Sequence, residues 1–216
     1  MGKKAKPSKT AAEKYKRLQD AFSNFDPEGV TVLTGNNGSG KSLFRKQLPF
    51  AFQQYCELDS VDKTKGMIKS TSMDARTTSN PEWGALSSVL TDTSWIATSQ
   101  NTFSSICKLF NAAEGSSTTM YVVIDEYEIG CSEETILALA RYINDRIKKL
   151  IADKKIIGAM IITHSRIGMR EIEHDHFVNL EGLTEQQWLS REIVPTDLDE
   201  LEANELFFYI RDHKQK

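Results

Sequence analysis

The chain has 216 residues, of which 39% are hydrophobic and 26% are charged, and its formal net charge at pH 7 is −3. This length and composition predict one globular domain with a substantial core and room for a small appendage. They exclude a membrane-spanning protein, because the longest strongly apolar stretch, Ile156–Ile162, is far shorter than the roughly 20 residues that cross a bilayer.

The first half of the chain predicts a strand that leads into a glycine-rich loop. Its apolar patterns indicate, in chain order, a helix over 10–24, a strand over Val30–Leu33 that ends at Gly35, a helix from Gly40 to Pro49, a strand over Met67–Met73 and a helix over Thr102–Ala113. Proline at position 49 is expected to stop or kink the second of these helices.

The second half predicts alternating strands and helices. Tyr121–Ile124 is an uninterrupted apolar run of the kind that a parallel sheet buries on both faces. A long helix capped by Ser132 follows, with one apolar stripe formed by Ile136, Leu139, Ala140, Ile143, Ile147 and Leu150. Strands are expected over Ile156–Ile162 and Phe177–Leu180. This alternation predicts an α/β fold with a mostly parallel sheet flanked by helices.

Residues 35–42, GNNGSGKS, match the phosphate-binding pattern GxxxxGK[ST], known as Walker A, without deviation. Glycines let the backbone curl so that amide N–H groups point at phosphate oxygens, and the following helix adds its positive end. Lys41 is expected to reach the β- and γ-phosphates, and Ser42 to supply a hydroxyl to Mg²⁺. The motif predicts a P-loop NTPase that holds ATP and Mg²⁺ through Gly35, Asn36, Asn37, Gly38, Ser39, Gly40, Lys41 and Ser42.

Two acidic residues, Asp125 and Glu126, follow the Tyr121–Ile124 strand in a Walker B pattern. Asp125 is expected to bind Mg²⁺ together with Ser42. In P-loop hydrolases a carboxylate just past the metal-binding aspartate can orient and deprotonate the attacking water, and Glu126 occupies that place. A strand that simply ends in solvated acids is the alternative.

The segment Ile161–Leu183, IITHSRIGMREIEHDHFVNLEGL, completes a resemblance to the ABC-type ATPase family. It resembles the switch region of that family, which is a buried strand, Thr-His, a helix and a short strand that ends in Leu-Glu-Gly. The resemblance implies that His164 senses the γ-phosphate and positions the water. A histidine that serves only packing is the alternative.

The family's signature, a Leu-Ser-Gly-Gly-Gln-like turn, acts across a dimer. The nearest match is Thr98–Thr102, and the resemblance implies that Ser99 contacts the γ-phosphate bound by the partner subunit. The signature glycines are missing, so an ordinary helix cap is the alternative. Only 58 positions (99 − 41) separate Lys41 from Ser99, which implies a reduced helical subdomain. The glutamine-loop residue is not assigned, because Gln53 and Gln54 come too early in the chain and a polar residue within 71–74 is the alternative. The aromatic residue that stacks on adenine is also not assigned, and its candidates by position are Tyr15, Phe22 and Phe25.

The two ends of the chain differ in charge. Lysines 3, 4, 6 and 9 precede the first acid, Glu13, and predict either a solvated tail or a salt-sensitive contact with nucleic acid. The segment from Glu181 to Glu205 contains eight acidic residues and one basic residue. The helix expected from Thr196 toward Ile210 is therefore a hypothetical site for a protein partner. We divide the chain into a basic tail and helix (1–24), an ATPase domain (25–183) and an acidic helical appendage (184–216).

These patterns predict a cytoplasmic, Mg²⁺-dependent ATPase. Three cysteines without a CxxC pair are typical of reduced thiols, and no apolar run follows the N-terminal lysines to make a secretory signal. We expect an ABC-like enzyme that forms a homodimer on binding ATP and acts as a clamp or switch, in DNA-related or phage- and defence-linked processes. Its catalytic residues are predicted to be Lys41, Glu126 and His164. The alternatives are a P-loop kinase with a small acceptor and a non-hydrolysing regulatory module.

Overall fold

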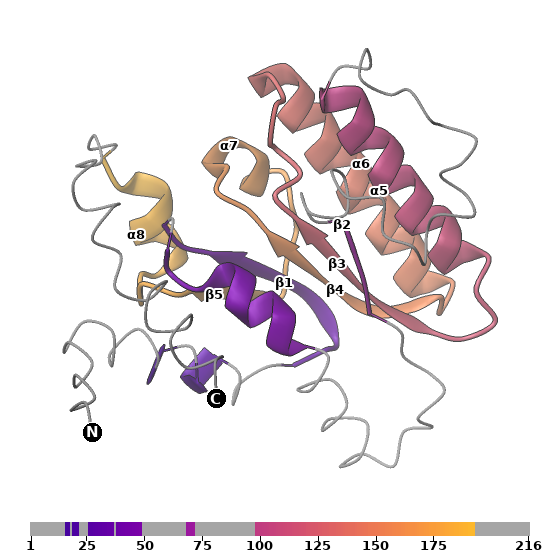
Figure 1. Cartoon of the computed structure of the whole chain (residues 1–216), viewed down its shortest axis with the longest axis horizontal. Helices are drawn as coiled ribbons and strands as arrows, with labels where there is room; N and C mark the ends of the chain where they lie inside the picture. Colours follow the sequence, from indigo (N-terminus) through magenta and orange to yellow (C-terminus); the bar gives the residue numbers. More distant parts are fainter. Residues whose placement is uncertain are drawn as a thin grey trace, which may run out of the picture.

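The computed structural model describes residues 16–17, 19–21, 26–36, 38–48, 68–71 and 98–192. Within them, five strands form one sheet in the order β2-β3-β4-β1-β5, and every strand pairing is parallel (Figure 1). The strands are β1 Gly29–Thr34, β2 Ile68–Thr71, β3 Met120–Asp125, β4 Ile156–Ile162 and β5 His176–Asn179. The predicted α/β fold with a mostly parallel sheet is therefore confirmed.

Helices lie on both sides of this sheet. Residues 16–17, 19–21 and 41–48 are helical, and the remaining helices are α5 Thr98–Glu114, α6 Glu133–Ala152, α7 Arg166–Met169 and α8 Glu185–Ser190. None of the helices in these described ranges is both long enough and apolar enough to cross a membrane.

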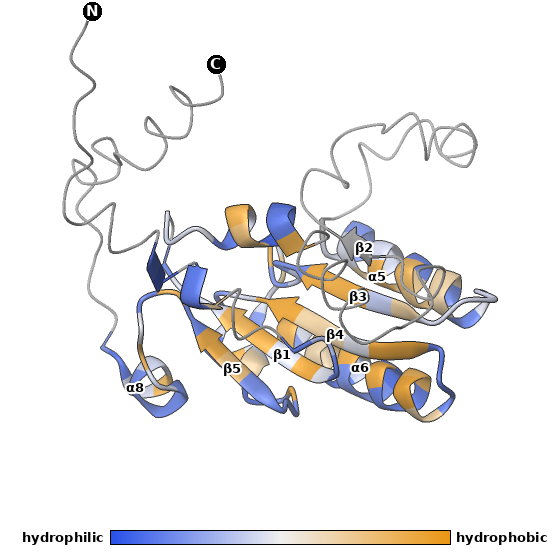
Figure 2. Ribbon diagram, turned by 90° about the horizontal axis from the view of Figure 1, so that it is seen from below, coloured by the Kyte–Doolittle hydropathy of each residue, from blue (hydrophilic) through white to orange (hydrophobic). Residues whose placement is uncertain are grey.

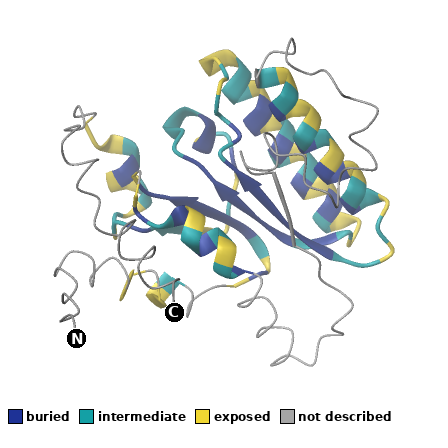
Figure 3. Cartoon of the chain, in the orientation of Figure 1, coloured by how far each residue is buried: buried dark blue, intermediate teal, exposed yellow. Residues whose placement is uncertain are grey.

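The sheet separates two apolar cores, because successive strand side chains point to opposite faces. On one face, Val122 and Ile161 pack with α5 and α6, which lie side by side (Figure 1). Trp188 of α8 is also buried in this cluster. On the other face, Leu33 and Met160 pack against the 41–48 helix. The central strands are apolar and buried along their length, as Figures 2 and 3 show.

Helix α6 illustrates how local sequence fixes an element. The Ser132 side chain accepts the Thr135 N–H at the first turn, and Glu133 and Glu134 complement the positive end of the helix. Five residues of the predicted stripe are buried, namely Leu139, Ala140, Ile143, Ile147 and Leu150. Each fully buried leucine or isoleucine contributes about 1.5–3 kcal/mol, so this face determines where the helix packs.

The prediction for α5 was wrong at its start. The helix was expected over Thr102–Ala113, but it begins at Thr98, so Thr98–Thr102 belongs to the helix and does not form a separate turn. Serine, threonine and asparagine have modest helix propensity, which favoured a loop. Thr102 is nevertheless fully buried, as is Ile106 one turn later, and this tertiary packing overrides the local preference.

Several predicted features lie outside the described residues. They are the lysine tail, Tyr15, Phe22, Phe25, Asn37, Gln53, Gln54, residues 72–74 and the helix from Thr196 toward Ile210.

Candidate functional site

The register of the sheet brings three strand ends into one row. Leu33 of β1 pairs with Ile162 of β4, and Ile162 pairs with Asp125 of β3. Strand β4 lies between the other two. The residues that follow these three positions therefore leave the sheet at the same carboxyl edge, where ligands of open α/β sheets bind.

The glycine-rich loop follows β1 at this edge. Gly35, Gly38 and Gly40 have φ values of +148°, +75° and +107°, a region that favours glycine. A Cβ on Gly35 would lie 2.5 Å from Ser39 Oγ. That hydroxyl is buried, and no residue of the described chain forms a hydrogen bond with it. A strand, a curled glycine loop and a helix on a parallel sheet are the P-loop NTPase arrangement.

Lys41 is folded onto the loop. Its Nζ donates to Gly35 O at 2.8 Å and to Asn36 O at 3.0 Å, and the residue is only 6% exposed. Burial lowers the pKa of the Lys41 ammonium to about 8, although the carboxylates of Glu126 and Asp125 oppose this change. Both of these partners are neutral carbonyls, so a phosphate oxygen would stabilise the buried ammonium.

Asp125 faces a cation that sequence reasoning missed. Arg45 Nε lies 3.3 Å from Asp125 Oδ2, and these side chains are 13% and 10% exposed. Burial raises the pKa of Asp125 to about 6, and Arg45 partly opposes the rise. Arg45 stands one helical turn after Ser42, and that spacing is its one sequence signal. A buried carboxylate that already holds a cation, together with the exposed Ser42 hydroxyl, is a hard oxygen donor set that fits Mg²⁺.

The predicted base and the predicted sensor are in contact. His164 Nε2 lies 3.3 Å from Glu126 Oε1, and these side chains are 33% and 28% exposed, so both remain accessible to solvent. Glu126 has a φ of +52°, which is uncommon for a residue other than glycine. Its N–H donates to Ile162 O at 2.8 Å, and this bond holds Glu126 against the end of β4.

A third acid, Glu128, joins this pair. Its Oε1 accepts the backbone N–H of His164 at 2.5 Å. The prediction did not include Glu128, and the repeated acid in Asp-Glu-Tyr-Glu is the signal that could have drawn attention to it.

Ser99 is not part of this row. It lies in the first turn of α5 and is partly buried. Among the described residues, no hydrogen bond or ion pair joins Ser99 to Lys41, Glu126 or His164. The predicted contact of Ser99 across a dimer stays a prediction.

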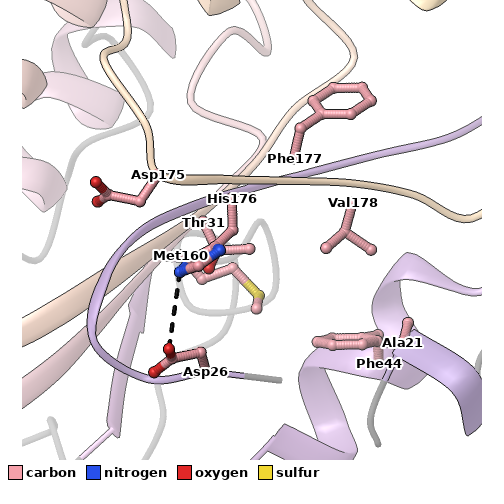
Figure 4. A pocket seen from close by; sticks show the side chains of 9 residues that line it. All are labelled: Ala21, Asp26, Thr31, Phe44, Met160, Asp175, His176, Phe177 and Val178. Atoms are coloured by element: carbon pink, nitrogen blue, oxygen red, sulfur yellow. Dashed lines mark ion pairs between the residues drawn. The ribbon is translucent and has the colours of Figure 1, made fainter. Parts of the chain in front are cut away.

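A separate hollow of about 310 Å³ lies toward the amino ends of β1 and β5 (Figure 4). Its lining residues are Ala21, Asp26, Thr31, Phe44, Met160, Asp175, His176, Phe177 and Val178. The imidazole of His176 and the carboxylate of Asp26 approach to 3.9 Å at one side of it. No predicted site residue lines this hollow, so it is distinct from the phosphate loop.

The chain matches no family model and no curated protein. The solved structures to which it is similar include C. elegans PCH-2 (16% identity, TM-score 0.37), the Aeropyrum pernix ORC2 protein in ADPNP–ADP complexes (14%, 0.37) and a chain of the E. coli MS115-1 HORMA:CdnC:Trip13 complex (14%, 0.40). The similarity covers 82%, 79% and 79% of this chain, but only 41%, 46% and 59% of those chains. At these TM-scores the similarities assign the chain to no particular family.

Proposed function

We propose that this chain is an ATPase that binds ATP with Mg²⁺ and transfers the γ-phosphoryl group to water. The observation that carries the proposal is the contact between Glu126 and His164 at the same sheet edge as the buried Lys41. A carboxylate that can accept a proton, an imidazole beside it and a desolvated ammonium are the groups that this hydrolysis requires.

Each group has a distinct role in the proposed reaction. The loop amides and Lys41 bind the phosphates, and Ser42 and Asp125 hold Mg²⁺, which neutralises charge on the β- and γ-phosphate oxygens when bound. Glu126 orients the attacking water and accepts its proton. His164 donates a hydrogen bond to the γ-phosphate and keeps the Glu126 carboxylate in place. Positioning and electrostatic stabilisation of this kind supply most of the catalysis in phosphoryl transfer.

We further propose an ABC-type mode of action, which rests on the resemblance of Ile161–Leu183 to the family's switch region. Two copies would close on ATP, with Ser99 of the partner subunit completing each site, and hydrolysis would release them as in a clamp or switch. A DNA-related or defence-linked role, a protein partner for the acidic C-terminal segment, the three-part division of the chain and a cytoplasmic location belong to the same proposal.

The substitution Glu126→Gln tests the reaction and the dimer together. We expect the variant to bind ATP, to lose nearly all turnover and to form a dimer with ATP and Mg²⁺, because the trapped γ-phosphate is not removed. Turnover and mass in solution are measured without any acceptor molecule, and turnover of the wild-type protein is then measured again with a small acceptor added. Glu173→Gln, which changes a carboxylate that is 73% exposed and pairs with Lys148 on the surface, is the matched control.

Two results for this variant and two for the wild-type protein count against the proposal. If the Glu126→Gln variant turns over ATP as fast as the wild-type protein, Glu126 has no role in the reaction. A variant that stays monomeric at saturating ATP contradicts the dimer. A wild-type protein that transfers phosphate only when an acceptor is added indicates a kinase, and one that binds ATP tightly without any turnover indicates a regulatory module.

A further inference from the structure

The carboxylate of Glu128 connects two loops that are far apart in the sequence. Glu128 lies in the turn after β3, and its Oε1 accepts the N–H of His164, 36 positions later and two residues after the end of β4, at 2.5 Å. Hydrogen bonds to an ionised acceptor are shorter and stronger than those between neutral groups. This bond therefore holds the main chain at the residue proposed to face the γ-phosphate.

The segment Thr163–Ser165 is otherwise held by strand β1 and by a bond within the segment. The N–H of Thr163 donates to Leu33 O at 3.1 Å, and the N–H of Ser165 donates to Thr163 Oγ1 at 2.9 Å. Of these three residues, His164 alone gives its N–H to a side chain from another loop. The backbone N–H of His164 is thus held by Glu128.

The turn that carries Glu128 has a well-fixed backbone. Tyr127 is fully buried in the core beside α7, and the Cys131 N–H donates to Glu128 O at 3.1 Å. At the start of the turn, the Glu126 N–H is bound to Ile162 O. Because this backbone is fixed, the Glu128 carboxylate can hold the His164 backbone in a defined position.

The other carboxylate oxygen of Glu128 forms no hydrogen bond with the described residues. Oε2 is buried, and no donor within the described part of the chain reaches it. The bond to His164 is thus the one hydrogen bond that this carboxylate makes there. The bond to His164 is therefore the interaction that accounts for this half-buried carboxylate.

We propose that Glu128 is a positioning residue for ATP hydrolysis, acting through His164. Glu128 sets the backbone of His164 while Glu126 contacts its ring, so the imidazole is held at both ends by one turn. This inference rests on the function proposed above. It adds a second acidic residue whose loss would slow the chemical step without weakening nucleotide binding.

Two substitutions at this position separate the hydrogen bond from the charge. Glu128→Ala removes the acceptor, and Glu128→Gln keeps an uncharged oxygen that can still accept the His164 N–H. For Glu128→Ala we expect kcat to fall about tenfold or more, because a displaced His164 would stabilise the transition state less well. We expect KM for ATP to stay close to wild type and the melting temperature to fall by only about 2–4 °C, the effect of losing one hydrogen bond in a chain of this size. Glu128→Gln is expected to recover much of kcat, and Glu173→Ala is the surface control.

A second measurement follows the contact itself. In the wild-type protein the His164 amide proton should resonate downfield in an NMR spectrum, and Glu128→Ala should remove this shift while Glu126→Gln leaves it. Unchanged kcat in Glu128→Ala overturns the inference. So do equal losses in the alanine and glutamine variants, a parallel rise in KM with loss of stability, or loss of kcat with the amide shift intact. A wild-type protein without turnover overturns the proposed function first, which distinguishes the two failures.

Discussion

The pair formed by Arg45 and Asp125 gives the most direct physical test of the site. The substitution Arg45→Met keeps most of the side-chain length and removes the positive charge. The two charged groups lie 3.3 Å apart and are 13% and 10% exposed. In the variant, the Asp125 carboxylate would remain buried without this cation, so the free energy of unfolding should fall.

The size of this loss follows from the geometry. At 3.3 Å and an effective dielectric constant of about 20, the attraction is about 5 kcal/mol, and removing one partner of a buried pair costs about 3–5 kcal/mol. Because the pKa of Asp125 is already about 6, the carboxyl can take up a proton in the variant, which limits the loss. We expect about 3 kcal/mol at pH 7.5, or a melting temperature lower by about 6–12 °C for a chain of this size.

The loss should depend on pH in a definite direction. The pKa of Asp125 is raised in the folded protein above its ordinary value of 3.8, so the folded state holds this proton up to about pH 6. At pH 5 the carboxyl is mostly protonated, the attraction of Arg45 is largely absent, and the effect of Arg45→Met should shrink to about 1 kcal/mol or less.

The assay is denaturant unfolding of the nucleotide-free protein at pH 5 and pH 7.5. Arg141→Met is the matched control, because Arg141 pairs with Glu171 at 2.8 Å on the surface, where solvent screens the interaction. The same substitution in an Asp125→Asn background should cost much less. An equal cost of Arg45→Met with and without the Asp125 charge would refute the reasoning, as would a cost that grows toward pH 5.

The remaining predictions concern packing and two titrating groups. Gly168→Ala should lower the free energy of unfolding by about 1–3 kcal/mol in urea titrations, because its Cβ would overlap the Tyr127 hydroxyl. The affinity for ADP should fall from pH 7 to pH 9.5, because burial lowers the pKa of Lys41 to about 8 in the free protein. Calorimetry should show that protons are taken up when ADP binds. An affinity for ADP that stays constant over this range would contradict the prediction. Hydrogen bonds, foremost from Lys149, lower the pKa of Glu114 from 4.5 to about 2. Glu114 therefore stabilises the fold above pH 4.5 and less as pH falls toward 2, so Glu114→Gln should destabilise at pH 5 and have little effect near pH 2.

The central strands were predictable because they are buried on both faces. The runs Val30–Leu33 and Tyr121–Ile124 contain no charged residue, and the observed strands extend each of them by one residue at either end. Ile156–Ile162 matches its predicted bounds. Helix α6 was equally predictable, because its N-cap and its apolar stripe are both local features of the sequence.

The order of the strands was not predictable in the same way. Nothing within Ile156–Ile162 indicates that β4 lies between β1 and β3, because strand pairing is a long-range property. That order is what places His164 beside Glu126. The sequence alone predicted Glu126 from its place after Asp125 and His164 from the family resemblance, but it could not predict their contact.

Arg45 and Glu128 escaped prediction for a related reason. A single charge in an amphipathic helix or in a turn is usually solvated, and only a partner from another strand end makes it part of a site. Arg45 finds its partner at the end of β3, and Glu128 finds its partner beyond β4. The helix after β1 and the turn after β3 both start at the carboxyl edge of the sheet. They lie close together there because only β4 stands between β1 and β3.

The charges gathered at this edge also favour the nucleotide together with its metal. Among the described residues, four carboxylates act on Lys41, those of Glu126, Asp125, Glu128 and Glu181. Arg45 pairs with Asp125, and Arg191 pairs with Glu181. With all of these groups ionised, the three cations and four carboxylates leave a balance of −1 (3 − 4). The pKa of Lys41 is nevertheless lowered, because desolvation outweighs the four attractions. A bare triphosphate would add negative charge to a partly buried, already negative edge. A divalent cation next to the Asp125 carboxylate would offset two negative charges, so the acids proposed to act in hydrolysis favour a phosphate ligand that binds together with its metal.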